Sequence, residues 1–202
     1  MPLWTAPRPL VLASRSAARR AMLDAAGIPL ETAAADIDER AVEAAAGKLV
    51  PHEAARLLAR EKALATAGQF AGRVVVGADQ TLALGERRFS KPRDAAAARA
   101  QLRALSGATH ELHSAVAVVR DGEVLFDHVD TARLTMRDLS DRFLDGYLAA
   151  AGPAAFTSVG GYQLEALGIH LFERIEGDHF TILGLPLLAL LAFLRREGLV
   201  LA

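Results

Sequence analysis

The feature that most constrains the fold is the valine run Val74–Val76, which is followed by Gly77-Ala78-Asp79-Gln80. Branched side chains pack well on a pleated surface, and a strand buried on both faces needs no polar alternation. The run therefore predicts a buried strand of an α/β sheet that stops at Gly77, with Asp79 just beyond its carboxyl end. Ligands of such sheets gather beyond the carboxyl ends of strands, so Asp79 is a candidate to hold a metal ion or a water molecule. The alternative is that Asp79 only caps a turn.

Apolar patterns and turn residues predict alternating strands and helices along the rest of the chain. Further strands are expected at 9–13, 28–35, 81–84, 110–120 and 123–136, and the last two flank the hairpin signal Asp121-Gly122. Helices are expected at 17–26, 51–67, 95–105, 140–150 and 186–198. The hairpin gives the sheet an antiparallel part.

Composition narrows the class of protein. The chain has 202 residues, enough for one compact unit with two lobes, and many of the residues in its 52% apolar content are alanines in charged helical stretches. No apolar run is long enough to span a membrane, so we expect a soluble, cytoplasmic protein. The absence of cysteine excludes disulfides, thiol nucleophiles and Cys-ligated zinc. A net charge of −1 argues against a nucleic-acid-coating protein.

Three groups of polar residues could carry chemistry. Ser14 and Ser16 precede a helix that contains Arg19 and Arg20, and hydroxyls, free helix amides and guanidinium groups together suit a phosphate. The alternative is an ordinary serine cap with solvated arginines. A second group is the acidic cluster Asp36, Asp38 and Glu39, which with Asp79 could hold a hard cation, or could be a solvated loop.

The third group lies later in the chain. Lys91 precedes Pro92, so its loop is extended and its side chain is oriented, whereas Lys62 on the helix 51–67 is uninformative by itself. The segment 160–165 carries glycines, a tyrosine and Glu165, which could read a flat ligand or form a turn with a buried tyrosine. His110 and His113 would point to opposite faces of one strand, so no zinc site is expected there.

Taken in order, these segments resemble the Maf family of nucleoside triphosphate pyrophosphatases. The segments that carry the resemblance are Leu12-Ala13-Ser14-x-Ser16 with Arg19, Asp36-x-Asp38-Glu39, Lys62-Ala63, Gly77-Ala78-Asp79, Lys91-Pro92, Leu105-Ser106-Gly107 with His110, Gly161-Tyr162-x-Leu164-Glu165 and Gly184-Leu185-Pro186. The resemblance covers roughly Leu10 to Leu194, so residues 1–202 are expected to form a single Maf-like domain.

The resemblance implies a fold, an activity and a set of site residues. The fold would be Maf/ITPase-like α/β, a long bent mixed sheet flanked by helices, with two lobes and a central cleft. The activity would be hydrolysis of a nucleoside triphosphate to the monophosphate and pyrophosphate with Mg²⁺ or Mn²⁺, and a homodimer is a further expectation. The implied phosphate and substrate ligands are Ser14, Ser16, Arg19, Lys62, Lys91 and Glu165; Glu39 and Asp79 would hold the metal, and Asp79 would also orient or deprotonate the attacking water.

Several positions depart from the usual family pattern. Ala17 and Ala18 stand where a proline and an arginine are common, Gln80 replaces a threonine, and Ser90 replaces a glycine. Glu165 stands where the branch that acts on dTTP and UTP usually has glutamine, which favours the 7-methyl-GTP branch because a carboxylate suits a cationic methylated guanine. The alternatives are a dTTP/UTP pyrophosphatase or, given the missing arginine, a catalytically impaired nucleotide-binding regulator.

Overall fold

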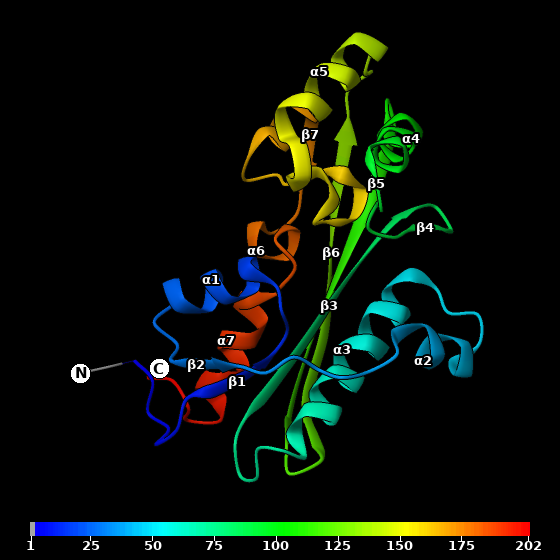
Figure 1. Ribbon diagram of the computed structural model, residues 1–202. Helices are drawn as coiled ribbons and strands as arrows, with labels where there is room; N and C mark the ends of the chain where they lie inside the picture. Colours follow the sequence, from blue (N-terminus) through cyan, green and yellow to red (C-terminus); the bar gives the residue numbers. More distant parts are fainter. Residues whose placement is uncertain (1–2) are drawn as a thin grey trace. The chain divides into compact units, whose positions relative to one another are not determined.

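The chain folds around a seven-stranded mixed sheet, seen here in a computed structural model that describes residues 3–202 (Figure 1). The strand order is β2-β1-β3-β5-β6-β7, and β4 pairs with β3. The pairs β1/β2 and β1/β3 are parallel, whereas β3/β4 and β6/β7 are antiparallel. The strands are β1 (Leu10–Ala13), β2 (Leu30–Thr32), β3 (Val75–Leu84), β4 (Arg87–Phe89), β5 (Thr109–Arg120), β6 (Glu123–Met136) and β7 (Phe172–Glu176).

Helices follow or precede these strands along the chain. They are α1 (Ala17–Ala25), α2 (Glu39–Ala46), α3 (Pro51–Ala67), α4 (Ala95–Leu105), α5 (Asp141–Ala151), α6 (His179–Ile182) and α7 (Leu187–Arg196), with 3₁₀ turns η1 (Gly152–Phe156), η2 (Val159–Gly161) and η3 (Leu167–Leu171). No helix within residues 3–202 is long and apolar enough to cross a bilayer.

The predicted α/β class with a mixed sheet is confirmed, and so are most of its elements. The helices α1, α3, α4, α5 and α7 and the hairpin β5/β6 lie where the sequence placed them, to within one or two residues at each end. Local chemistry explains this agreement. Asp94 and Ser140 cap α4 and α5 through side-chain bonds to backbone amides, and Pro51 occupies the first turn of α3.

One expectation about the strands was wrong, and one helix was not predicted. The strand predicted to end near Gly77 continues through Asp79 to Leu84, so the valine strand and the strand predicted at 81–84 form one ten-residue strand, β3. Asp79 therefore lies in the middle of β3, although β1, its parallel neighbour, already ends with Ala13 opposite Gly77. The sequence did not predict the helix α2, which begins at Glu39 after Asp36 and Asp38, because Asp38 accepts bonds from the amides of Arg40 and Ala41.

The chain forms two compact units. Unit 1 comprises the residues up to Gln80, Ser114–Asp130 and Asp178–Ala202, and unit 2 comprises Thr81–His113 and Thr131–Gly177. The strands β3, β5 and β6 contribute residues to both units. The expectation of one domain over residues 1–202 stays a prediction.

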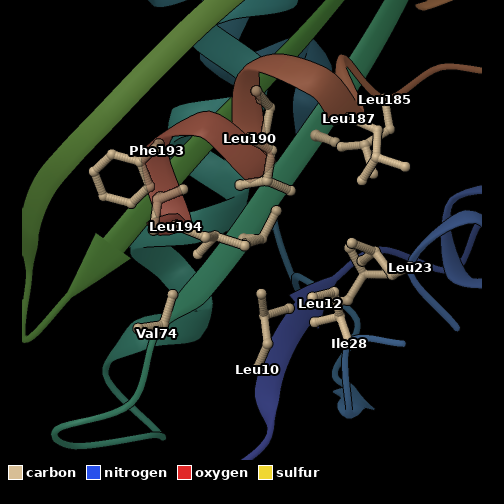
Figure 2. Close-up of a cluster of buried hydrophobic side chains, with 14 of the residues drawn as sticks. Leu10, Leu12, Leu23, Ile28, Val74, Leu185, Leu187, Leu190, Phe193 and Leu194 are labelled. Carbon is tan, nitrogen blue, oxygen red and sulfur yellow. The ribbon is translucent and has the colours of Figure 1, made fainter. Parts of the chain in front are cut away.

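In unit 1 the sheet has an apolar core on each face. Leu10 and Leu12 of β1 lie in a cluster with residues of α1 and α7, whereas Val11 and Ala13 lie in a cluster with the alanines of α3. Figure 2 shows part of the first cluster, in which leucines of α7 such as Leu190 face Leu10 and Leu12 of β1. This alternation confirms that β1 and the first half of β3 are buried on both faces.

Gly77 sets the distance between β3 and α3. A Cβ atom built on this glycine would lie 2.1 Å from the carbonyl oxygen of Ala59 and 2.7 Å from the nitrogen of Ala63, both on α3. No side chain fits there. Gly77 thus serves close helix-to-strand packing rather than ending the strand, and it brings the α3 side chains next to β3 within reach of Asp79.

Unit 2 has a buried aromatic core around His110. The His110 imidazole Nε2 lies 2.7 Å from the Tyr162 hydroxyl, and both rings pack against Phe172. Burial lowers the pKa of His110 to about 4 and raises the pKa of Tyr162. The buried tyrosine that the sequence offered as the plain interpretation of the segment 160–165 is therefore present. His113 bonds to Thr131 instead, on the other face of β5.

Candidate functional site in unit 1

The ammonium group of Lys62 joins two carboxylates from different parts of the sequence. Its Nζ lies 2.6 Å from Oδ1 of Asp79 and 2.8 Å from Oε1 of Glu39. The side chains of Lys62 and Asp79 are only 13% and 12% exposed, so their charges are largely removed from water, whereas that of Glu39 is 52% exposed. Ion pairs in such an environment interact more strongly than pairs on the surface.

Three secondary-structure elements position these groups. Asp79 shares the face of β3 that carries Val75 and Gly77, and this face packs against α3. Lys62 is next to Ala63 on α3, where Gly77 allows the helix to approach. Glu39 is the first residue of α2, and its position follows from the cap that Asp38 makes.

A second group of predicted residues forms the turn between β1 and α1. Ser16 caps α1, and its Oγ accepts a bond of 3.3 Å from the amide of Arg19. Ser14 Oγ accepts bonds from the amide of Ser16 and from Nη1 of Arg19, both at 3.2 Å. Because each serine oxygen acts as an acceptor here, each hydroxyl hydrogen can still be donated to an anion.

The guanidinium of Arg19 is built into the protein rather than extended into solvent. Its Nε donates to the carbonyl of Gly184 at 2.8 Å, and its Nη1 donates to the carbonyl of Ala78 at 2.8 Å. Burial lowers the pKa of Arg19, and the carboxylates of Asp79 and Glu39 act in the opposite direction. Arg19 stays protonated at any ordinary pH, so it places a fixed positive charge near both carboxylates.

The arrangement in unit 1 can therefore receive a polyanion. The Nη2 group of Arg19 makes no hydrogen bond to any residue in 3–202, and two serine hydroxyls lie at the N-terminal end of α1. A helix N-terminus presents unpaired amides, and its dipole favours negative charge. The plain interpretation of Ser16 as a helix cap is correct, and it does not exclude phosphate binding.

The residues proposed for the divalent cation fit that role in number and type. One carboxylate oxygen of Glu39 and one of Asp79 lie against the ammonium group of Lys62, which neutralises their charges. Mg²⁺ commonly takes one or two protein carboxylates and completes its shell with water and phosphate oxygens. Within the described part of the chain there is no cage of three or more Asp, Glu or His side chains, so substrate oxygens and water would have to complete the shell.

Other members of the acidic and basic clusters do not join this group. Asp38 is occupied as the cap of α2, and Asp36 makes no ion pair or hydrogen bond with Lys62 or Asp79. The expectation that the whole cluster surrounds one cation is thus reduced to Glu39 and Asp79. Arg20 forms an exposed pair with Asp24 at 3.4 Å, so it has a partner of its own on the surface of α1.

The remaining predicted residues, Lys91 and Glu165, belong to unit 2. Lys91 is exposed and precedes the buried Pro92, and Gln101 donates to the carbonyl of Ser90 at 2.8 Å, which holds the loop in place. Glu165 is exposed in the turn after Tyr162, and its carboxylate bonds to no other residue in the described range. The roles of both residues stay predictions.

Sequence reasoning missed a polar network next to Asp79. The side-chain amide of Gln80 lies 2.9 Å from Ser114 Oγ and within 3.2 Å of the carbonyls of Thr181 and Ile182. Ser114 also donates to the Thr181 carbonyl at 2.7 Å, and Ser114 and Thr181 are fully buried. The sequence could not reveal this network, because the partners of Gln80 are distant in the chain. Its one signal was that Gln80 departs from the family pattern.

Comparison with known proteins matches almost the whole chain to one protein family. Residues 9–197 match the family of Maf-like proteins. A nucleoside triphosphate pyrophosphatase of Bradyrhizobium diazoefficiens is 59% identical over 99% of both chains, and one of Rhodopseudomonas palustris is 57% identical over the same shares. A 7-methyl-GTP pyrophosphatase of Brucella abortus is 54% identical over 93% of this chain and 96% of its own.

Proposed function

This chain belongs to the Maf-like family, and from that premise we propose that it hydrolyses nucleoside triphosphates to the monophosphate and pyrophosphate through the residues around Asp79. The observation that carries the proposal is the convergence of Lys62 on Asp79 and Glu39, with Arg19 bonded to the carbonyl next to Asp79. Phosphoryl transfer asks a protein mainly for positioning and for neutralising charge, and this group offers both. The activity is that of a hydrolase acting on phosphoric anhydrides.

Asp79 is the proposed base. Its Oδ1 is held by Lys62, and Oδ2 makes no hydrogen bond to any residue in 3–202, so Oδ2 is the oxygen that can accept a proton from water. The water oxygen bonds to the α-phosphorus as the bond from that phosphorus to the bridging oxygen breaks. The proton passes to Asp79, and pyrophosphate leaves with the bridging oxygen. No covalent enzyme intermediate forms.

The basic groups bind the negatively charged phosphates of the substrate and of the leaving pyrophosphate. Arg19, the serine hydroxyls and the free amides of α1 hold triphosphate oxygens, and Lys62 and Lys91 stabilise the leaving pyrophosphate. A divalent cation bound by Glu39 and Asp79 would supply further neutralisation of the triphosphate. Lys62 keeps the two carboxylates close together and oriented toward that position.

We propose 7-methyl-GTP as the preferred substrate, with Glu165 as a contact to the base. Support comes from the name of the Brucella relative and from the chemistry of a carboxylate, which suits a cationic methylated guanine and accepts from the N–H edge of guanine. The relatives from Bradyrhizobium and Rhodopseudomonas carry the broader name.

The test measures pyrophosphate release with Mg²⁺ from 7-methyl-GTP, GTP, UTP and dTTP. We expect turnover in the wild type and a loss of about 10²–10⁴-fold in Asp79→Asn, because a positioned base is removed. Asp24→Asn, on the surface of α1, is the matched control and should keep full activity. A folded Asp79→Asn protein with wild-type turnover would contradict the assignment of the base.

Specificity is tested separately. Glu165→Gln should lower kcat/KM for 7-methyl-GTP by about tenfold relative to UTP, since a charge-assisted contact is lost. A wild type that prefers UTP or dTTP would overturn the 7-methyl-GTP proposal and leave the mechanism in place. Tight nucleotide binding without any product would identify a binding protein instead of an enzyme.

A further inference from the structure

Unit 2 carries an open depression that none of the predicted site residues lines. Its volume is about 480 Å³, within the range of pockets that hold small molecules. It lies between α5 and η3, and Ser140, Arg142, Phe143, Gly146, Tyr147, Leu167 and His170 are among the residues that line it.

Aromatic rings form a rigid wall of this depression. Phe143 and Tyr147 stack with their ring centroids 6.3 Å apart and an interplanar angle of 16°. The guanidinium of Arg137 lies over the Phe143 ring, 4.0 Å from its centroid, and Arg137 also donates to the carbonyl of His170 at 2.7 Å. The Tyr147 hydroxyl is already bonded to the Gly161 carbonyl, so this ring presents mainly an apolar surface.

Gly146 keeps the depression open. It lies in the interior of α5, where glycine costs about 1 kcal/mol relative to alanine. A Cβ atom at this position would meet no other atom within 4 Å, and its φ is not in the left-handed region, so neither packing nor backbone conformation requires a glycine. A side chain at this position would instead extend into the depression. Leu167, which lines it too, is 43% exposed.

The charges around the depression favour an anion. No acidic residue lines it, and the two acidic residues of α5 are turned toward α4: Asp141 pairs with Arg99 and Arg103, and Asp145 pairs with Arg99. Arg142 and His170, which do line it, have no ion-pair partner among residues 3–202. The Ser140 oxygen accepts from the amide of Phe143, so its hydroxyl hydrogen can also be donated.

We propose that this depression binds a small organic anion with a planar hydrophobic body, such as an aromatic carboxylate. The planar body packs against the Phe143–Tyr147 wall and Leu167 in the space left by Gly146. The anionic group lies at the open rim, where Arg142, His170 and the Ser140 hydroxyl offer donors. This assignment is independent of the nucleotide chemistry at Asp79.

Two probes of the same shape test the proposal: 2-naphthoate, which is an anion, and 2-naphthamide, which is neutral. Each is titrated into the ¹⁵N-labelled protein while backbone amide shifts are followed. We expect naphthoate to shift amides of α5 and η3 and to bind about tenfold more tightly than naphthamide, since a charge-assisted contact is present only in the anion. Shifts spread over the whole molecule, or equal affinity for both probes, would overturn the proposal.

Two variants with matched controls locate the binding. Gly146→Leu fills the depression and should abolish the shifts that naphthoate causes. Gly68→Leu adds the same side chain at an exposed glycine of unit 1 that also has open space around it, and this variant should bind naphthoate as the wild type does. Arg142→Gln should weaken naphthoate about tenfold, and Arg195→Gln on α7 should not. Unchanged binding in Gly146→Leu overturns the proposal. A dimer in the wild type that Gly146→Leu dissociates also overturns it, in favour of a second copy as the occupant.

Discussion

Lys62 Nζ lies 2.6 Å from Asp79 Oδ1, and this contact links α3 to the middle of β3. The same nitrogen is 2.8 Å from Glu39, so one ammonium group neutralises both carboxylates that are proposed to hold a cation. Removal of the ammonium leaves two negative charges next to each other, one of them buried, and this has consequences for stability and for cation binding.

Lys62→Met should therefore destabilise the protein by about 3 kcal/mol, because the Asp79 charge loses its partner. Added Mg²⁺ should raise the midpoint of thermal unfolding of this variant more than that of the wild type, since a cation can then take the place of the ammonium. Differential scanning calorimetry with and without Mg²⁺ checks both points. In the double variant Lys62→Met/Glu39→Gln, Mg²⁺ should raise the midpoint of thermal unfolding less than it does in Lys62→Met. An equal rise in these two variants would contradict binding of the cation by Glu39.

Gly77→Ala should be among the most damaging single-methyl changes in unit 1. The new Cβ would lie 2.1 Å from the Ala59 carbonyl, so α3 would have to move away from β3. We expect a loss of about 3 kcal/mol in urea unfolding, at the upper end of the range for overpacking, together with weaker activity because Lys62 moves with α3. Gly68→Ala, at the end of the same helix and with open space around it, should cost less than about 0.5 kcal/mol. Similar losses in both variants would refute the packing argument.

Arg19→Lys tests whether the protein needs the two hydrogen bonds that the Arg19 guanidinium donates to separate carbonyls. Lysine keeps the charge but cannot bond to the carbonyls of Gly184 and Ala78 together, so stability should fall by about 2 kcal/mol. KM for the nucleotide should rise, because the group that faces the phosphates is displaced. Arg20→Lys is the neighbouring control, and its exposed pair with Asp24 predicts a change near zero. Equal behaviour of the two variants would show that Arg19 is not anchored as described.

His110 makes the stability of unit 2 depend on pH. Burial lowers its pKa in the folded state from 6.5 to about 4, and its Nδ1 has no hydrogen-bond partner among the described residues. Between pH 4 and pH 6.5 the His110 imidazole therefore binds a proton in the unfolded state but not in the folded state, so protonation favours unfolding. The stabilisation is fully present above pH 6.5 and is lost as the pH falls from 6.5 to 4, by up to about 3 kcal/mol.

The measurement for His110 is urea unfolding at pH 7.0 and pH 4.5. His110→Gln, which can still bond to Tyr162 and does not titrate, should lose less free energy of unfolding between these two values than the wild type. His179→Gln, an exposed histidine of α6, should behave like the wild type. An unchanged pH dependence in His110→Gln would rule out His110 as its source.

Much of this architecture could be predicted from the sequence, because the relevant interactions are local. Helix ends are fixed by side chains a few residues away, as at Asp94 and Ser140, and the hairpin between β5 and β6 is fixed by Asp121-Gly122. The resemblance to the Maf family likewise rests on short motifs in a fixed order, and the family match over residues 9–197 confirms it.

Other features depend on residues that are far apart in the chain. Gly77 looked like the end of a strand, but α3 packs directly on it, and Asp79 lies inside β3 rather than at its mouth. Lys62 looked uninformative until folding placed it between Glu39 and Asp79. Sequence alone determined most of the longer elements, the family and which charged residues were candidates. Tertiary structure decided which charges pair and which stay available, because burial and distance set the strength of each interaction and neither follows from local sequence.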